Sequence, residues 1–270
     1  MISCAGLIVR EDSERASLCA EKAKAFFHAK GIRTVDPLCT QGEPDPDIIL
    51  TFGGDGTLLS GKEASVRYGA PLFGVNLGNM GFLTEGDPDR LDSILPALTE
   101  GRFETEKRSL LRVRVPGQED NWLAMNDAVL TRGGFARLIQ VNTFVNGEHF
   151  ATFTADGVIV ATPTGSTGYS LSAGGPVVAP DVRCMILTPV CAHSLQHCPC
   201  IVPDNAEIRI RLAEKRNQSA ELQIDGKGVL TLPTGTEITV TGAEEQISLI
   251  RLKPYEFFTL TRDKLIEWGS

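Results

Sequence analysis

The sequence predicts an α/β domain followed by a mostly β domain, and three observations support this fold class. Over residues 1–101, apolar runs alternate with stretches rich in Ala, Glu and Lys, which is the pattern of strands alternating with helices. Over residues 102–251, short apolar runs are separated by turn residues, which is typical of an all-β domain. A chain of 270 residues, 42% of them hydrophobic, is long enough to bury the cores of two such domains.

Caps and breakers place the elements of the first domain. The apolar run 2–9 predicts a buried strand, and Asp12 or Ser13 then caps a helix that ends at Gly31. The run 48–52 lacks polar alternation, as expected for a parallel strand that is covered on both faces. The other expected elements are strands at 32–35 and 70–76 and helices at 57–68 and 88–100.

The second domain is expected to consist of short strands. The dipeptide Asn146-Gly147 separates two alternating runs and is the strongest two-residue hairpin signal. The expected strands lie at 109–115, 123–132, 139–145, 149–162, 206–212, 220–225 and 236–242, and residues 262–270 predict a final helix.

Composition favours a small-molecule ligand. The formal net charge of −8 argues against nucleic acid and against anionic membranes as partners. The N-terminal residues combine a short apolar run with early charges and no basic leader, so neither a signal peptide nor a membrane span is expected and the protein is expected in the cytoplasm. The seven cysteines, an odd number, are expected to be reduced thiols.

The stretch "TFGGDGT" follows the predicted strand 48–52 directly and concentrates glycine around one carboxylate, Asp55. Beyond the carboxyl end of a parallel strand, backbone amides can approach phosphate oxygens, and Asp55 could orient an attacking hydroxyl or contact a magnesium ion between phosphates. A tight strand-to-helix turn with an exposed aspartate is the alternative, and the glycine count alone does not decide between them. The predicted phosphate-binding residues are Gly53, Gly54, Gly56 and Thr57.

Two well-known nucleotide motifs do not fit. "GTLLSGKE" has the spacing of a P-loop, but Glu63 stands where Ser or Thr should meet magnesium. No strand-to-helix stretch carries the Gly-x-Gly-x-x-Gly pattern of a Rossmann fold. A dinucleotide, if bound, must be held in another way.

The pair Asn126-Asp127 brings an amide and a carboxylate together within a strand pattern. An amide matches the edge of adenine, and a carboxylate accepts hydrogen bonds from a ribose diol. Neighbouring strand residues point to opposite faces, so both can touch one ligand only at a strand end or a bulge. A polar turn at a strand edge is the competing interpretation.

The segment "ADGVIVATPTGSTGYSLSAGGP", residues 155–176, opens from a buried strand into a run dense in hydroxyls and glycine. Many neutral donors and acceptors suit a large polar ligand that carries phosphates, sugars and an amide. A serine hydrolase is a poor alternative, because the segment lacks the Gly-x-Ser-x-Gly elbow and no histidine lies nearby.

Taken in order, the motifs resemble those of the ATP-dependent NAD kinases of bacterial type over most of the chain. The motifs are "GGDGT", "GVNLGNMGFLTE", "MNDAVLTRG", "DGVIVATPTGSTGYSLSAGGPVV", "LTPVCAHSL" and "RDKLIEWG". "GGDG" alone is weakly specific, because 6-phosphofructokinases and lipid kinases carry similar turns. The hydroxyl-rich segment and the Asn-Asp pair single out the NAD kinases.

The resemblance implies a fold of the NAD kinase and diacylglycerol kinase type, with an α/β domain and a β-sandwich domain. The closing helix, residues 252–270, would return to the domain formed by residues 1–101. It also implies phosphoryl transfer from ATP to the 2′-hydroxyl of the adenosine ribose of NAD, with Mg²⁺ carried by the nucleotide and no dedicated protein metal site. A homodimer or homotetramer is implied, with an NAD site shared between subunits.

Residue roles carry over by motif. Asp55 would be the catalytic carboxylate with Gly56 beside it, Asn126 and Asp127 would contact the adenosine half of NAD, and Phe82 matches an aromatic near that half. The nicotinamide side would be held by Asp156, Thr167, Gly168, Tyr169, Ser170, Leu171 and Ser172, and variable pocket positions match Arg137, Thr154 and Lys227. Many relatives have Asn-Glu at the Asn126-Asp127 pair, so the shorter Asp127 reaches less far.

"CAHSLQHCPC", residues 191–200, contains zinc-ligand residue types, but Cys198-Pro199-Cys200 leaves one intervening residue where zinc knuckles have two or more. No metal site is expected there. Two other function classes stay open: a lipid kinase, which needs a wide apolar cleft for acyl chains, and an NAD or NADP sensor, which would keep the pocket without the reaction.

Overall fold

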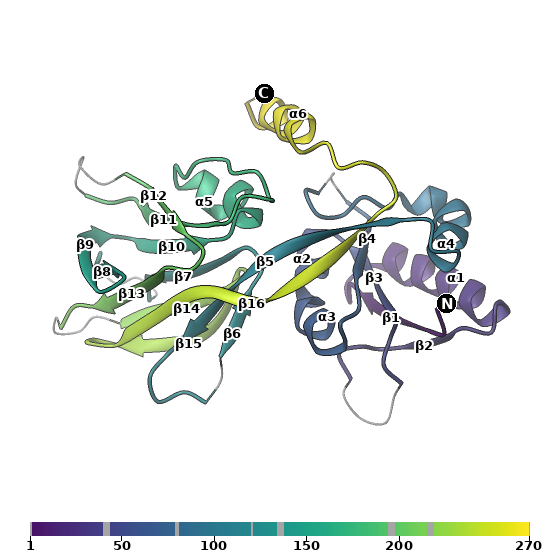
Figure 1. The fold of residues 1–270 in the computed structure, drawn as a ribbon, viewed down its shortest axis with the longest axis horizontal. Helices are drawn as coiled ribbons and strands as arrows, with labels where there is room; N and C mark the ends of the chain where they lie inside the picture. Colours follow the sequence, from purple (N-terminus) through teal and green to yellow (C-terminus); the bar gives the residue numbers. More distant parts are fainter. Residues whose placement is uncertain are drawn as a thin grey trace. The chain divides into compact units, whose positions relative to one another are not determined.

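The structure, a computed structural model, describes residues 2–39, 44–78, 81–119, 121–133, 138–193, 198–214 and 219–269. The chain forms two compact units, one of Met1–Arg108 with Gln246–Ser270 and one of Ser109–Glu245. It passes from one unit to the other inside two strands, β5 (Glu104–Arg114) and β16 (Glu237–Arg251) (Figure 1). The sequence had placed the domain limits at the ends of these strands.

A parallel sheet organises the first unit. Its strands are β1 (Cys4–Val9), β2 (Arg33–Val35), β3 (Ile48–Gly53) and β4 (Leu72–Asn76), in the order β2-β1-β3-β4. The last part of β16 continues the sheet beside β4, where Leu249 lies opposite Leu72. Because β3 and β4 run parallel, their carboxyl ends, Gly53 and Asn76, lie opposite each other at one edge.

Helices cover both faces of this sheet, which is why its strands lack polar alternation. The helices α1 (Glu14–Ala29) and α4 (Leu91–Thr99) pack on the face that carries Ile48, Leu50 and Phe52 of β3. On the other side lie α2 (Asp55–Ser60) and α3 (Lys62–Tyr68) (Figure 1).

Three helical segments differ from the sequence prediction. The helix expected at 57–68 begins at Asp55 and is interrupted at Gly61, where a Cβ would lie 3.0 Å from both Ile8 and Leu72. A 3₁₀ turn, η1 (Pro88–Arg90), precedes α4, and the final helix α6 (Phe257–Gly269) starts between the two expected positions, residues 252 and 262. In the part of the chain that the structure describes, no helix has the length and apolar character needed to cross a membrane.

Two antiparallel groups of strands form a β-sandwich in the second unit. One group contains β5, β6 (Trp122–Ala124), β8 (Ile139–Val145), β9 (Glu148–Ala155), β13 (Glu207–Leu212) and β16. The other has the order β12-β11-β10-β7-β14-β15 and consists of β7 (Asp127–Arg132), β10 (Gly157–Ala161), β11 (Cys184–Val190), β12 (Cys200–Pro203), β14 (Ser219–Ile224) and β15 (Lys227–Pro233). The predicted hairpin is confirmed, because Asn146 and Gly147 join β8 to β9 with φ of 50° and 85°.

Strand β10 is buried on both faces, and this positions the hydroxyl-rich segment. Val158 and Val160 lie in the sandwich core, whereas Ile159 and Ala161 belong to a second apolar cluster with Val178. Directly after β10, the chain turns into η2 (Thr164–Thr167) and α5 (Tyr169–Ser172). The segment therefore begins at the carboxyl end of a central, fully buried strand.

Gly157, the first residue of β10, tests this close packing. A Cβ there would lie 2.6 Å from the carbonyl oxygen of Leu130, a backbone atom that cannot move aside cheaply, so Gly157→Ala should lower the free energy of unfolding by about 1–3 kcal/mol. Gly228→Ala in β15 is the matched control, because a Cβ there meets no described residue within 4 Å. Denaturant unfolding of both variants checks this, and equal midpoints would contradict it.

Candidate active site

The carboxylate of Asp55, the first residue of α2, is held by the backbone of a loop that follows β4. Its Oδ2 accepts a hydrogen bond from the Phe82 amide at 2.7 Å, and its Oδ1 accepts from the Thr84 amide at 3.1 Å. The Leu83 amide lies 3.2 and 3.3 Å from the two oxygens, and the Thr84 hydroxyl donates to Oδ1 at 2.9 Å. A carboxylate fixed by consecutive amides has a defined position.

Gly81 makes this approach possible. A Cβ on Gly81 would lie 2.0 Å from Oδ1 of Asp55, so a side chain there is incompatible with the observed position of the carboxylate. From this loop, the motif resemblance assigned a role to Phe82 and none to Gly81, Leu83 or Thr84. Backbone donors leave no mark in the residue types, and only the run "GFLT" after a buried strand indicated this loop.

The glycines around Asp55 have different reasons to be glycine. A Cβ on Gly53 would lie 2.1 Å from Oγ1 of Thr57, so the fold itself requires a glycine there. A Cβ on Gly54 or Gly56 would meet nothing within 4 Å among the described residues, and neither residue has a positive φ. Within the described part of the chain, neither packing nor backbone conformation therefore requires glycine at these two positions.

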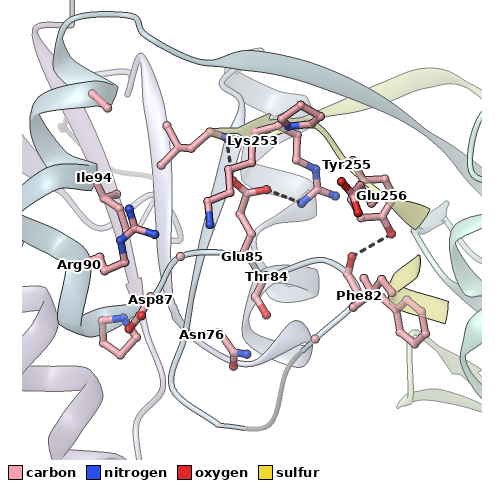
Figure 2. A pocket seen from close by; sticks show the side chains of 18 of the residues that line it. Asn76, Phe82, Thr84, Glu85, Asp87, Arg90, Ile94, Lys253, Tyr255 and Glu256 are labelled. Carbon is pink, nitrogen blue, oxygen red and sulfur yellow. Dashed lines mark hydrogen bonds and ion pairs between the residues drawn. The ribbon is translucent and has the colours of Figure 1, made fainter. Parts of the chain in front are cut away.

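The C-terminal segment, residues 251–255, donates hydrogen bonds to the carbonyl groups of this loop. Arg251, which is 5% exposed, donates through Nη1 to the Leu83 carbonyl at 3.1 Å, and the Tyr255 hydroxyl donates to the Phe82 carbonyl at 3.2 Å. The Arg251 guanidinium also pairs with Glu85 at 3.3 Å and Glu106 at 2.9 Å. Figure 2 shows Tyr255 reaching the Phe82 carbonyl. The loop that holds Asp55 is thus fixed through its carbonyls as well as its amides.

A cavity of about 920 Å³ lies beside this loop in the first unit. Its lining includes Thr84 and Glu85 of the loop and Lys253 of the C-terminal segment. The Arg90 and Lys253 side chains extend into the hollow (Figure 2). Asp55 is not among the residues that line it.

In the second unit, Asn126 and Asp127 stand at the start of β7, which is the strand end that the sequence analysis required. The Asp225 carboxylate accepts hydrogen bonds from three consecutive amides: Met125 at 3.0 Å, Asn126 at 2.7 Å and Asp127 at 3.2 Å. Asp225 lies in the turn between β14 and β15 and was not recognised in the sequence. No motif links it to residues that lie 98 to 100 positions earlier.

The Asn126-Asp127 pair places polar groups in buried positions at a cost in free energy. Asp127 is 5% exposed, and burial, followed by the charge of Asp225, raises the pKa of its carboxyl to about 7. The Oδ1 atom of Asn126 is buried and has no hydrogen-bond partner among the described residues. Both features cost folding free energy, and such groups concentrate at functional sites.

Several hydroxyls of the hydroxyl-rich segment are used inside the fold. Thr162 donates to the Met125 carbonyl at 2.6 Å, Ser166 donates to the Val178 carbonyl at 3.1 Å, and Ser170 bonds Thr188 at 2.9 Å. Ser166 and Ser170 are 0% exposed, so their hydroxyls stabilise the segment. This differs from the expectation that the whole run of hydroxyls faces a ligand, whereas the NAD contact assigned to Ser170 stays a prediction.

The remaining predicted residues of the second unit lie in several elements. Tyr169 is 44% exposed, and burial together with nearby ionisable groups at Cys191, Asp156 and Asp127 raises the pKa of its phenol. Asp156 pairs with Arg132 at 2.8 Å. A Cβ on Gly168 would lie 3.8 Å from Nδ2 of Asn126 and 4.0 Å from Oδ2 of Asp127, so this segment closes over the pair.

The other predicted residues are spread over several elements. Thr154 lies on β9, Thr167 ends η2, and Leu171 and Ser172 belong to α5. Lys227 is exposed at the start of β15, while Arg137 lies outside the described residues.

In the described part of the Cys/His segment, residues 191–193 and 198–200, metal-ligand side chains do not gather. No disulfide joins any of the seven cysteines in the described structure, and Cys191 and Cys198 are exposed. Nowhere along the described part of the chain do three or more His, Cys, Asp or Glu side chains gather as metal ligands. His197, one of the residue types that suggested zinc, lies outside the described residues.

Comparison with known proteins gives the same family for both units. A family model described as the ATP-NAD kinase N-terminal domain matches residues 6–103, and one described as the ATP-NAD kinase C-terminal domain matches residues 125–252. The NAD kinase of Thermoanaerobacter sp. strain X514 is 42% identical over 224 residues, which cover 82% of this chain and 79% of that protein. The NAD kinase of Moorella thermoacetica is 40% identical over 95% of this chain and 81% of its own length.

Two solved structures have the same fold. Yeast NADH kinase complexed with NADH superimposes with a TM-score of 0.89 at 26% identity and covers 100% of this chain and 88% of its own. The NAD kinase of Archaeoglobus fulgidus in complex with ATP gives a TM-score of 0.78 at 26% identity, with coverage of 96% and 98%. From the matched domains, the relatives and the carboxylate in its glycine turn, this chain belongs to the NAD kinase family.

Proposed function

We propose that this protein transfers the γ-phosphoryl group of ATP to the 2′-hydroxyl of the adenosine ribose of NAD, and that Asp55 is the catalytic carboxylate. The observation that carries the proposal is the fixed Asp55 carboxylate at the carboxyl edge of a parallel sheet, between two glycines whose backbone is open among the described residues. Ligands of open α/β sheets bind at that edge. The family of the chain supplies the reaction.

Phosphoryl transfer passes through a loose transition state, so catalysis depends on alignment of the reacting groups. Asp55 would accept a hydrogen bond from the sugar hydroxyl, hold it in line with the γ-phosphate and take its proton late. Its oxygens already accept from three backbone amides and the Thr84 hydroxyl. The sugar hydroxyl would replace the Thr84 hydroxyl, because a side-chain hydroxyl can rotate away whereas the amides cannot.

Magnesium would arrive with ATP. Mg²⁺ in kinase sites is held mostly by phosphate oxygens and water, together with one or two carboxylates, and this donor set fits a turn that offers Asp55 and open backbone at Gly54 and Gly56. When bound, the ion neutralises charge that develops between the β- and γ-phosphates. Gly53 and Thr57 complete the proposed phosphate-binding turn.

The NAD contacts are proposed from the buried polar groups of the Asn126-Asp127 pair. The buried Oδ1 of Asn126 would accept from the adenine amino group, and Asp127 would accept from a ribose hydroxyl. Tyr169, Asp156 and Gly168 lie close to this pair in the second unit.

We also propose that the enzyme acts in the cytoplasm as a homodimer or homotetramer in which a neighbouring subunit completes the NAD site. The proposal rests on the motif resemblance. The exposed apolar side chains of Phe258 and Ile266 on α6, at 74% and 65% exposure, are available for subunit contact.

Replacement of the catalytic carboxylate tests the proposal. Purified protein incubated with ATP, magnesium and NAD should form NADP. Asp55→Asn keeps the shape but removes the charge that accepts the proton, so turnover should fall by roughly 10²–10⁴-fold while calorimetry shows NAD binding within a few fold of the native protein. Near-native turnover would show that Asp55 is not the catalytic carboxylate. Phosphorylation of a lipid without formation of NADP would show that the protein is a lipid kinase.

Thr84→Val is the control for disturbance of the loop. It removes one hydrogen bond to Asp55 and leaves the carboxylate and the three amide donors in place. Turnover should fall by less than about tenfold. A loss as large as that of Asp55→Asn would show that loop order, and not the carboxylate, limits the reaction.

The buried carboxyl of Asp127 predicts pH dependence. Because the pKa of Asp127 is raised to about 7, its ionised form appears as the pH rises through 7, and the KM for NAD should fall between pH 6 and pH 8. Asp127→Asn should make this KM independent of pH. If the KM of the native protein for NAD does not change over this pH range, Asp127 does not contribute to NAD binding.

The free energy of unfolding should fall as the pH rises, whereas the binding of NAD should improve. Because the pKa of Asp127 is raised in the native protein, the carboxyl of the unfolded chain loses its proton at a lower pH. The free energy of unfolding therefore falls as the pH rises from about 4 to 7. Relative to the native protein, Asp127→Asn should gain on the order of 2 kcal/mol at pH 8 and little at pH 4. Denaturant unfolding at the two pH values measures the difference.

A further inference from the structure

We propose that Asp225 is a positioning residue for NAD: its carboxylate clamps the backbone of residues 125–127 and so fixes the direction in which Asn126 and Asp127 present their side chains. The inference rests on the proposed NAD contacts of this pair. It concerns a residue in another hairpin that no motif of the sequence pointed to. Asp225 is not proposed to touch substrate.

The clamp uses both oxygens of one carboxylate. Oδ2 accepts from the Met125 amide at 3.0 Å, while Oδ1 accepts from Asn126 at 2.7 Å and from Asp127 at 3.2 Å. The Asp225 amide in turn donates to the Asp127 carbonyl at 3.0 Å. Residues 125–127 are therefore bound to one turn through three donors and one acceptor.

The turn that carries Asp225 has the backbone conformation of a tight hairpin. Asp225 has a φ of 49° and Gly226 a φ of 77°, so both are left-handed, as in a two-residue hairpin turn. The strands that flank the pair and the turn are neighbours, with Ile224 of β14 opposite Ala128 of β7. The carboxylate is thus delivered from a rigid hairpin, and aspartate is one of the few residues that adopt this φ readily.

Closing the hairpin does not require a carboxylate, as a second hairpin of the same unit shows. Asn146, with a φ of 50°, precedes Gly147 in the β8–β9 turn, and its Oδ1 accepts one amide, that of Glu207, at 2.9 Å. A neutral amide side chain serves there. At the β14–β15 turn, a carboxylate accepts three amides instead.

The carboxylate at position 225 also has a cost that a neutral residue would avoid. Its charge adds to burial in raising the pKa of the Asp127 carboxyl. Placing two carboxyl groups together is unfavourable, whereas an asparagine offers one acceptor oxygen and would direct an NH₂ group at backbone donors. The full acceptor capacity of aspartate toward residues 125–127 accounts for its presence.

The test compares isosteric swaps in the two hairpins. Asp225→Asn keeps the left-handed turn and removes one acceptor oxygen and the charge, and Asn146→Asp makes the reverse swap in the control turn. Asp225→Asn should raise the KM for NAD by tenfold or more, with kcat within about threefold and the KM for ATP unchanged. Asn146→Asp should leave all three constants within about twofold.

Hydrogen–deuterium exchange gives a readout that does not depend on turnover. The peptide that contains residues 123–128 should exchange faster in Asp225→Asn, because its clamped amides lose an acceptor, and should exchange normally in Asn146→Asp. Calorimetric titration with NAD should show weaker binding to folded Asp225→Asn, with foldedness checked by circular dichroism.

Three results would overturn the inference: an unchanged KM for NAD in Asp225→Asn, an equal rise in the constants for NAD and ATP, or the same losses in Asn146→Asp. Failure of the proposed function looks different, because the native protein would then form no NADP. In that case the NAD titrations still decide whether Asp225 positions the pair, since weaker binding to Asp225→Asn alone would support it and equal binding would refute it.

Discussion

The hydrogen bonds from the backbone amides of Phe82, Leu83 and Thr84 to the Asp55 carboxylate are the interactions on which the site of the first unit depends. They hold because the same loop is fixed from its other side by Arg251 and Tyr255. A buried guanidinium needs its carboxylate partners, so removal of one of them would leave part of the Arg251 charge uncompensated and weaken the support of the loop. The position of Asp55 therefore depends on the C-terminal segment as well as on the loop itself.

In both units, a carboxylate of one segment accepts hydrogen bonds from consecutive backbone amides of another segment. Asp55 does so with residues 82–84, and Asp225 with residues 125–127. Backbone groups have few degrees of freedom, so geometry defined by them is more exact than geometry defined by long side chains. Asp127 shows a cost of this arrangement, because burial and the charge of Asp225 raise the pKa of its carboxyl and so lower the stability of the fold once that carboxyl is ionised.

The fold class was predictable because its causes are local: strands covered on both faces lack alternation, and Asn146-Gly147 specifies a hairpin. The need for glycine at residue 61, where the helix is interrupted, was not, since Ile8 and Leu72 approach this position only after folding. Asp55 stood out as one charge among glycines, but its partners are amides, which every residue has. The hydroxyl-rich segment was visible, whereas the inward use of Ser166 and Ser170 follows from tertiary packing.

The support of the Asp55 loop by residues 251–255 ties the first motif of the chain to its last segment. During translation, the glycine turn leaves the ribosome long before Arg251 and Tyr255, whose bonds hold the Leu83 and Phe82 carbonyls. A nascent chain or a fragment that stops before residue 251 carries Asp55 without these two bonds to its loop. The glycine turn and the loop that holds its carboxylate therefore reach their full order only once the last segment of the chain has been made.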